Sequence, residues 1–296
     1  MDCRVTLVQS NPRLGDLHAN LAGHVERIEA LADNADLIVF PELSLTGYFL
    51  KDQVFELGLA LDSPELAQLA ELSRRVSLMV GFVERAPEGR LYNSAAFFED
   101  GQLLDVHRKV HLVSYGLFDE ARDFSAGEDF RVVQSKHGRF GPLICEDVWH
   151  TPSAYLHFLD HADAMVVLSA SPARGVEASG GEGLASQRTW DTLLAATSLF
   201  YRTYVLYASR VGWEDGIGFT GGSCVFGPGG DLLGQLPPLE TGELAARLDT
   251  GALHRARVAT PLRRDEKPGI LYRELARHVR LPRPDTGAGI DLESAP

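Results

Sequence analysis

A cysteine at the end of a short apolar segment is the feature of this chain with the clearest chemical use. Residues 140–144 are apolar and few enough to form a buried strand, and Cys145 follows them directly. A thiol in that position lies at the edge of a sheet, where free backbone N–H groups can meet a ligand. Only a few per cent of a free thiol is thiolate at neutral pH, so a nucleophilic Cys145 requires a base or a cation close by.

Two charged residues follow other predicted strands. Glu42 comes after the apolar residues 37–40, and Lys109 comes after residues 103–107. Because strand ends converge on one edge of a sheet, we expect a carboxylate, an ammonium and a thiol to lie close together there. In that arrangement Glu42 takes the thiol proton, while Lys109 and the backbone N–H of Glu146 stabilise the charge of a tetrahedral intermediate.

The sequence around these three residues resembles the nitrilase, or carbon–nitrogen hydrolase, superfamily. The segments FPELSLTGY, HRKVHL and GPLICEDVWH are similar to its glutamate, lysine and cysteine motifs, in the family's chain order. The resemblance extends from Val5 to about residue 250. It implies an α/β fold, an αββα four-layer sandwich. It also implies that a second glutamate, Glu120, orients the lysine and the substrate.

The flanking segments are most similar to the glutaminase domain of glutamine-dependent NAD synthetases. These segments include LVQSNPRLGDLHAN, KVHLVSYGLFDEARDF and SASP. The similarity implies that Tyr115 and Phe118 line the substrate pocket and that Ser171 contacts the substrate. The chain ends where the ATP-using synthetase domain of that family begins, and no segment resembles that domain. The segment after SASP is rich in glycine, whereas a basic segment is expected there in that family.

Each residue also has a purely structural interpretation. A free cysteine after an apolar strand is most often a small buried hydrophobe, which is how we interpret Cys3 and Cys224. Taken singly, Glu42 could be a solvated turn residue and Lys109 part of a basic surface cluster. The three motifs occur together and in the family's chain order, which favours a catalytic role for Glu42, Lys109 and Cys145 over these interpretations.

Other chemistries have weaker support. His107 and His111, like His157 and His161, have the i,i+4 spacing of zinc ligands, but the first pair brackets the lysine motif and the second has no third ligand at a convincing spacing. A Cys–His protease arrangement would need a histidine in a context as definite as that of Glu42. The segments GPGGD and GGEG lack the Lys-Ser/Thr ending of a phosphate-binding loop. We therefore predict no metal and no cofactor.

The composition limits the class of protein. The 296 residues include 28 Lys and Arg against 41 Asp and Glu, a formal net charge of −13. This balance argues against nucleic acid or an anionic membrane surface as a partner. Three scattered cysteines suggest no disulfide framework, and we find neither a signal peptide nor a membrane-spanning segment. The sequence predicts a soluble, cytoplasmic protein.

The order of predicted elements suggests one hydrolase domain over residues 1–260 and a C-terminal extension over residues 261–296. Alternation of strand and helix comes first, and paired strands follow, one pair joined by the turn signal Asp100-Gly101. We predict strands over residues 5–9, 37–40, 78–84, 91–99, 103–107, 131–134, 140–144, 164–169, 203–209, 223–226, 232–236 and 243–248. Helices are predicted over residues 17–32, 64–76, 155–161, 184–201 and 271–279. Residues 108–130 and 175–183 are predicted loops, 259–265 a linker and 282–296 a loose tail.

These features predict an amidase that cleaves a small carboxamide to an acid and ammonia through a thioester at Cys145. A nitrilase with the same three residues, and a glutaminase subunit that supplies ammonia to a separate ATP-dependent synthetase, remain alternatives. A non-catalytic binding protein on the same scaffold is a further alternative. The resemblance also implies a homodimer or larger homo-oligomer, with the C-terminal extension crossing to the partner. Residues 110–130 and 173–183 are the expected pocket rim.

Overall fold

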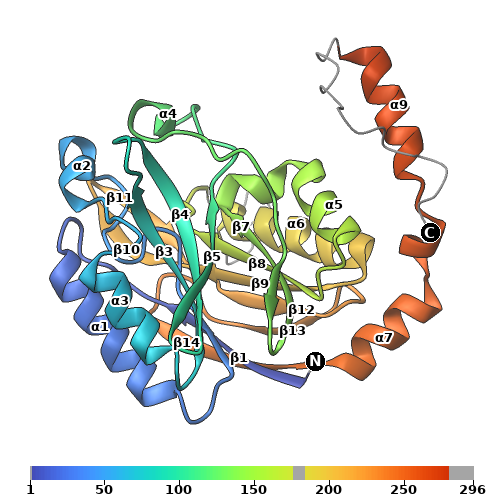
Figure 1. Cartoon of the computed structure of the whole chain (residues 1–296), viewed down its shortest axis with the longest axis horizontal. Coiled ribbons are helices and arrows are strands. Elements are labelled where there is room, and N and C mark those ends of the chain that lie inside the picture. The colour runs from blue at the N-terminus through green and yellow to red at the C-terminus, as the bar shows by residue number, and fades with distance from the viewer. Residues whose placement is uncertain (1, 176–183, 280–296) are drawn as a thin grey trace.

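The computed structural model describes residues 2–175 and 184–279, and within them the strands form two six-stranded sheets and a separate two-stranded hairpin (Figure 1). The strand order is β14-β1-β2-β3-β4-β5 in the first sheet and β13-β12-β9-β8-β7-β6 in the second. The first sheet comprises β1 (Asp2–Gln9), β2 (Leu37–Val39), β3 (Ser77–Arg85), β4 (Leu91–Glu99), β5 (Gln102–Arg108) and β14 (Gly242–Asp249). The second comprises β6 (Val133–Ser135), β7 (Gly138–Ile144), β8 (Ala164–Ser169), β9 (Tyr204–Ser209), β12 (Cys224–Phe226) and β13 (Leu232–Gln235).

Each sheet has parallel strands at its centre and antiparallel strands at its edges. In the first sheet β1, β2 and β3 are parallel, and in the second β7, β8 and β9 are parallel. The other pairings are antiparallel. Parallel strands end at the same edge of a sheet, so the residues that end or follow β7 and β8 are neighbours.

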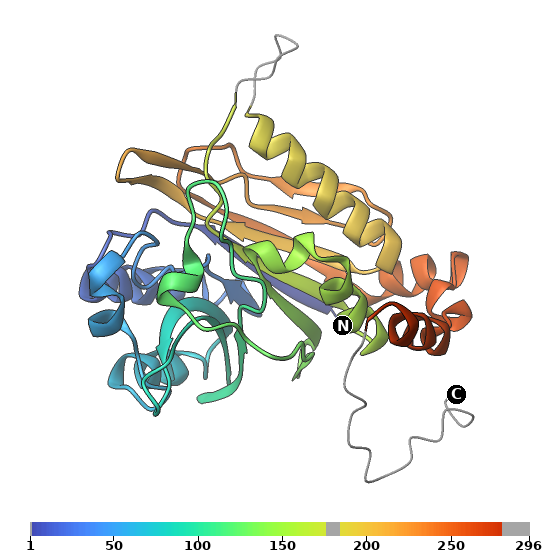
Figure 2. The same cartoon turned by 90° about the horizontal axis from the view of Figure 1, so that it is seen from above.

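Helices cover the outer face of each sheet. Helices α1 (Leu17–Leu31) and α3 (Pro64–Leu72) pack on the first sheet, and α5 (Thr151–Leu159) and α6 (Ala185–Tyr201) pack on the second. Figure 2 shows α6, in yellow, running along the outer face of the second sheet, on the side away from the first. The predicted αββα four-layer sandwich is confirmed.

The main core lies between the two sheets. Side chains such as Val5 and Leu7 from the first sheet meet Val166 and Leu206 from the second, and all four are almost completely buried. The alternation of strand side chains supplies this layer from one face of each sheet, while the other face packs against the helices. Burial on both faces explains why the central strands are continuously apolar in sequence.

Local sequence signals account for several boundaries. Asp16 caps α1 by accepting the N–H of Ala19, and Ser63 caps α3 ahead of its first-turn proline. The predicted hairpin turn is confirmed, because Asp100 and Gly101 both have a positive φ, 53° and 84°, between β4 and β5.

Some elements differ from the prediction. The linker over residues 259–265 is wrong, because α7 (Thr250–Ala259) ends there and a short helix, α8 (Leu262–Asp265), follows. The last predicted helix begins three residues earlier, as α9 (Pro268–His278). The prediction also omitted the hairpin of β10 (Val211–Glu214) and β11 (Ile217–Thr220), and the short helices α2 (Val54–Leu57) and α4 (Glu120–Asp123). Only Leu253 of α7 is buried, so that helix has no apolar stripe to reveal it in the sequence.

Helices α7 and α9 lie outside the four layers, at one end of the molecule (Figures 1 and 2). The division at residue 260 stays a prediction. The predicted tail over residues 282–296 and most of the loop over residues 175–183 lie outside the described residues. Within the part of the chain that the structure describes, no helix has the length and apolar character needed to cross a bilayer.

Candidate active site

Glu42 lies in a tight loop just after β2 and is completely buried. One carboxylate oxygen, Oε1, accepts a hydrogen bond from Asn93 Nδ2 at 2.7 Å, and Oε2 accepts the N–H of Ala170 at 2.7 Å. Gly81 makes room for this loop, because a Cβ there would lie 2.3 Å from the carbonyl oxygen of Pro41. Strands of both sheets therefore orient the carboxylate.

Lys109 follows β5 and is also buried. Its Nζ donates to Glu42 Oε1 at 2.8 Å and to Glu120 Oε1 at 2.7 Å, so one ammonium lies between two carboxylates. Burial by itself would lower the pKa of Lys109, but the charges of Glu42 and Glu120 raise that pKa well above its usual value. Burial raises the pKa of Glu42, the charge of Lys109 opposes this effect, and that of Glu120 adds to it.

Glu120 begins α4 within the long connection after β5 and is buried. Its Oε2 accepts the N–H of Val113 at 2.8 Å, and the hydroxyl of Tyr48 donates to Oε1. Tyr48 comes from the same segment as Glu42. The segment after β5, which carries Lys109 and Glu120, is thus joined to the loop after β2 by two hydrogen bonds. One joins Lys109 to Glu42, and the other joins Tyr48 to Glu120.

Cys145 lies directly after β7, at the start of a short 3₁₀ helix, η2 (Cys145–Trp149). The hydroxyl of Ser169 donates to Cys145 Sγ at 3.5 Å, and the next residue, Ala170, donates its N–H to Glu42. Burial raises the pKa of the Cys145 thiol, and the charge of Glu42 raises it further, while Lys109 has the opposite effect. The resting thiol is therefore protonated and needs a base before it can act as a nucleophile.

A cavity of about 360 Å³ opens onto Cys145. Its lining includes the three residues implied as substrate contacts, namely Tyr115, Phe118 and Ser171, together with Tyr48, Trp149 and Trp190. The Tyr115 hydroxyl donates to the Glu146 carboxylate at 2.9 Å, and Trp190 Nε1 donates to Ser171 Oγ at 2.7 Å. The lining combines aromatic side chains with polar groups such as Ser171 and Glu146, which is typical of a small-molecule site.

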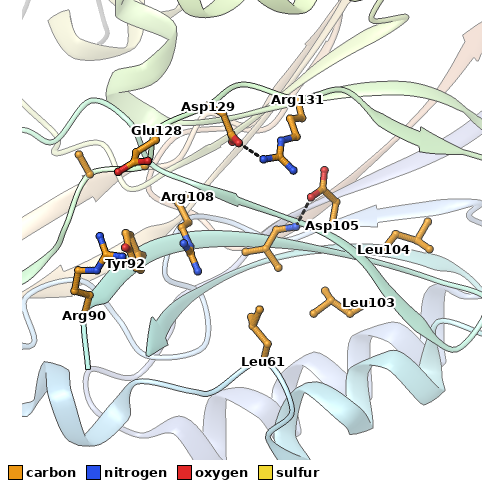
Figure 3. Close-up of a pocket in the computed structure, with 13 residues that line it drawn as sticks. Leu61, Arg90, Tyr92, Leu103, Leu104, Asp105, Arg108, Glu128, Asp129 and Arg131 are labelled. Atoms are coloured by element: carbon orange, nitrogen blue, oxygen red, sulfur yellow. Dashed lines mark hydrogen bonds and ion pairs between the residues drawn. The ribbon is translucent and has the colours of Figure 1, made fainter. Parts of the chain in front are cut away.

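A larger cavity, of about 520 Å³, lies against β5 at the free edge of the first sheet (Figure 3). Its arginines are paired with carboxylates: Arg108 with Glu84, and Arg131 with Asp129 as drawn in Figure 3. No cysteine is found among the described residues around it. The smaller cavity is therefore the candidate active site, because a thiol lines it and another lining residue, Tyr48, donates a hydrogen bond to Glu120 of the buried charged cluster.

The structure places the predicted site residues in two groups: among the described residues, Cys145, Tyr115, Phe118 and Ser171 line the cavity, whereas Glu42, Lys109 and Glu120 do not. Glu42, Lys109 and Glu120 form one hydrogen-bonded cluster, and the cavity beside it reaches Cys145. The sequence analysis missed two residues of this cluster, Asn93 and Tyr48. Tyr48 ends the quoted motif FPELSLTGY, so its position was visible, whereas Asn93 is one polar residue within a buried strand.

A model of the carbon–nitrogen hydrolase family matches residues 4–258. The chain belongs to this family and is a hydrolase. It is 33% identical over 267 residues to a glutamine-dependent NAD(+) synthetase of Thermotoga maritima, a match that covers 88% of this chain and 44% of that protein. The chain thus spans less than half the length of that relative.

Two further proteins are similar over nearly their whole length. A probable nitrilase of Schizosaccharomyces pombe is 28% identical over 259 residues, which is 84% of this chain and 89% of that protein. The solved structure of an amidase from Nesterenkonia sp. is 26% identical, with a TM-score of 0.70 over 86% of this chain and 95% of that one. The chain is therefore similar to a synthetase, a nitrilase and an amidase.

Proposed function

We propose that the protein hydrolyses a small carboxamide to a carboxylic acid and ammonia through a thioester on Cys145. The observation that carries this proposal is the buried cluster of Lys109 between Glu42 and Glu120, beside a cavity that reaches a thiol. Similarity to an amidase over almost all of its chain supports the same reaction class. Small amides fit a cavity of about 360 Å³.

In the first half-reaction Glu42 accepts the thiol proton while Cys145 Sγ attacks the carbonyl carbon. The raised pKa of Glu42 suits a group that must take a proton and then return it. The carbonyl then re-forms, the C–N bond breaks, and the proton passes from Glu42 to the departing nitrogen. Ammonia leaves, and the acyl group remains on sulfur.

Two positive groups stabilise the oxyanion of the tetrahedral intermediate in this proposal. Lys109 stays charged because of the two carboxylates around it, and its ammonium lies next to Glu42. The backbone N–H of Glu146 lies in the first turn of η2, where N–H groups have no partner within the helix. Oxyanion donors of this kind contribute a hundredfold or more in rate.

Water completes the reaction in the second half. Glu42 takes a proton from water, the resulting hydroxide attacks the thioester, and the C–S bond breaks with return of the proton to Cys145. Tyr115, Phe118 and Ser171 contact the acyl part of the substrate, since all three line the cavity. Glu120 orients Lys109 throughout.

The test is ammonia release from the purified chain with a panel of carboxamides, the matching nitriles and glutamine. We expect the amides to be hydrolysed, and Cys145→Ala, Glu42→Gln and Lys109→Ala to lose activity while circular dichroism is unchanged. The matched control is Cys224→Ala, a buried cysteine of β12 that is not among the described residues lining the cavity and that should keep its activity. Full activity of Cys145→Ala would contradict the proposal, and release from nitriles alone would favour a nitrilase.

A second candidate is a glutaminase that supplies ammonia to a separate ATP-dependent synthetase. Similarity to the Thermotoga maritima synthetase supports it. This candidate predicts slow ammonia release from glutamine by the chain alone and faster release when a separate NAD synthetase domain and ATP are added. Equal rates with and without that domain would contradict it.

We also propose that the protein is cytoplasmic and that it is a homodimer or larger homo-oligomer. In α9, apolar side chains including Ile270, Leu271 and Leu275 are nearly half exposed, as expected for a segment that packs on another copy. Light scattering of the full-length protein should show more than one chain per particle. A variant truncated after residue 260 should form particles with fewer subunits. A monomeric full-length chain would contradict this proposal.

A further inference from the structure

The backbone at Cys145 is in a conformation that a cysteine rarely adopts. Its φ is +44°, within the left-handed region that favours glycine. Such a residue persists only where its surroundings over-determine the conformation, and these sites are often functional. The turn from β7 into η2 therefore needs specific interactions that keep it in place.

Asp147, two residues after the cysteine, supplies these interactions. Its carboxylate is completely buried, and Oδ2 accepts the N–H of Ile144 at 3.0 Å. The same oxygen accepts a hydrogen bond from His107 Nε2 at 2.9 Å. The other oxygen, Oδ1, accepts the N–H groups of Val110 and His111 at 3.1 and 2.9 Å.

These four hydrogen bonds connect two segments from different sheets. Ile144 precedes Cys145 at the end of β7, whereas Val110 and His111 follow Lys109 at the end of β5. Burial would raise the pKa of Asp147, but the hydrogen bond and charge of His107 and the backbone N–H donors lower it below its usual value. The carboxylate is therefore ionised, and ionised acceptors form the stronger hydrogen bonds.

We propose that Asp147, supported by His107, is a positioning residue that fixes the thiol of Cys145 relative to the ammonium of Lys109. The inference rests on the proposed function, because it assigns these two groups to one reaction. Asp147 acts through the backbone on both sides, because its hydrogen-bond donors are the N–H groups of Ile144, Val110 and His111 and the ring of His107. His107, two residues before Lys109, ties β5 itself to the same carboxylate.

The decisive variant is Asp147→Asn. Asparagine has the same shape but only one acceptor oxygen in place of two. The hydrogen bonds of Ile144 and His107 to Oδ2, or those of Val110 and His111 to Oδ1, are therefore lost. A small displacement of reacting groups can cost on the order of a hundredfold in rate. We therefore expect kcat for ammonia release to fall about a hundredfold, with KM within about threefold, and the alkylation rate of Cys145 by iodoacetamide to fall at least tenfold.

A matched control separates positioning from stability. Asp163 is a largely buried aspartate that accepts the N–H of Arg139 and pairs with Arg257, and it directly precedes β8, at the opposite edge of the sheet from Cys145. We expect both Asp163→Asn and Asp147→Asn to lower the melting temperature. It should leave kcat and alkylation within about twofold of the native values.

A second variant covers the case in which Asp147→Asn does not fold. His107→Gln removes the ring from the same carboxylate, and we expect a tenfold loss in kcat and slower alkylation. If the two residues act as a unit, the double variant loses little more than Asp147→Asn alone.

The proposal is overturned if these variants lower the melting temperature but leave kcat and alkylation unchanged. The alkylation rate does not depend on knowing the substrate. If the native chain releases no ammonia from any amide, the proposed function fails, and alkylation still tests the positioning role.

Discussion

Two clusters of buried charges involve the segment that follows β2, and they differ in their balance of charge. In one cluster Arg210 pairs with Glu214, and both side chains are almost completely buried. In the other, Lys109 lies between Glu42 and Glu120. The first has one carboxylate for one cation, and the second has two carboxylates for one cation.

The balanced pair has a structural role. Glu214 accepts the N–H groups of Tyr48 and Phe49 at 3.0 and 2.9 Å, and the guanidinium of Arg210 lies 4.1 Å from the centre of the Phe219 ring. These contacts attach the hairpin of β10 and β11 to the loop that carries Tyr48.

In the proposed mechanism the unbalanced cluster supplies the carboxylate that takes a proton and returns it. Two carboxylates beside one ammonium carry a net negative charge when all three groups are ionised, and burial makes that charge costly. The pKa of Glu42 is raised as a result. The comparison indicates that chemistry comes from the excess carboxylate, since burial and ion pairing are common to both clusters.

The largest expected difference is between Glu42→Gln and Glu214→Gln. Removing the carboxylate of Glu42 removes the base, so we expect kcat to fall on the order of a thousandfold. Glu214→Gln leaves Arg210 buried without its charge partner and should cost about 3–5 kcal/mol in the free energy of unfolding. Its kcat, measured well below the melting temperature, should stay within about threefold, because glutamine retains an oxygen that can accept the N–H of Tyr48.

Ammonia release and thermal unfolding measure the two effects separately. A Glu214→Gln protein that is folded but as inactive as Glu42→Gln would contradict the assignment of a structural role to one cluster and a catalytic role to the other. A Glu42→Gln protein with native activity would instead remove Glu42 from the mechanism.

The sequence predicted the acidic, basic and thiol groups because each follows a strand within a recognisable motif. Glu42, Lys109 and Cys145 are placed by the ends of β2, β5 and β7. Strands β2 and β7 are short apolar segments, and β5 was predicted from its pairing with β4 across the Asp100-Gly101 turn signal. The four layers followed from the family resemblance. What the sequence could not predict was which polar side chains inside strands meet across the two sheets.

Asn93 and Ser169 illustrate this limit. Each lies in a buried strand, and only strand register and the packing of the two sheets bring Asn93 to Glu42 and Ser169 to Cys145. The hairpin of β10 and β11 is different, because Asp215-Gly216 is a turn signal that we overlooked. Both residues have a positive φ, 49° and 78°, as in the hairpin that was predicted.

A smaller effect is expected from Tyr48→Phe, which alters the unbalanced cluster without changing its charge. The variant removes the hydroxyl that donates to Glu120, so the carboxylate that orients Lys109 loses one hydrogen bond. A hydrogen bond to a charged group is worth about 1.5–3 kcal/mol, and we expect kcat to fall on the order of tenfold. Tyr204→Phe is the control, since its hydroxyl bonds the backbone of Asp249 at the other end of the sheet, and it should keep native kcat.

The smallest effect is on the pH dependence of stability, and it tests the excess carboxylate directly. The pKa of Glu42 is raised in the folded chain, so the folded state binds more protons than the unfolded state between about pH 4.5, the usual value, and the folded pKa. Its contribution to stability is therefore complete below about pH 4.5 and is lost as the pH rises through the folded pKa. As the pH rises over this range, the native protein should lose stability relative to the Glu42→Gln protein, by about 1.4 kcal/mol per pH unit at most. Urea unfolding of both proteins at several pH values measures it, with Glu214→Gln as the balanced control. A difference that does not change with pH would mean that the unbalanced cluster does not raise the pKa of Glu42.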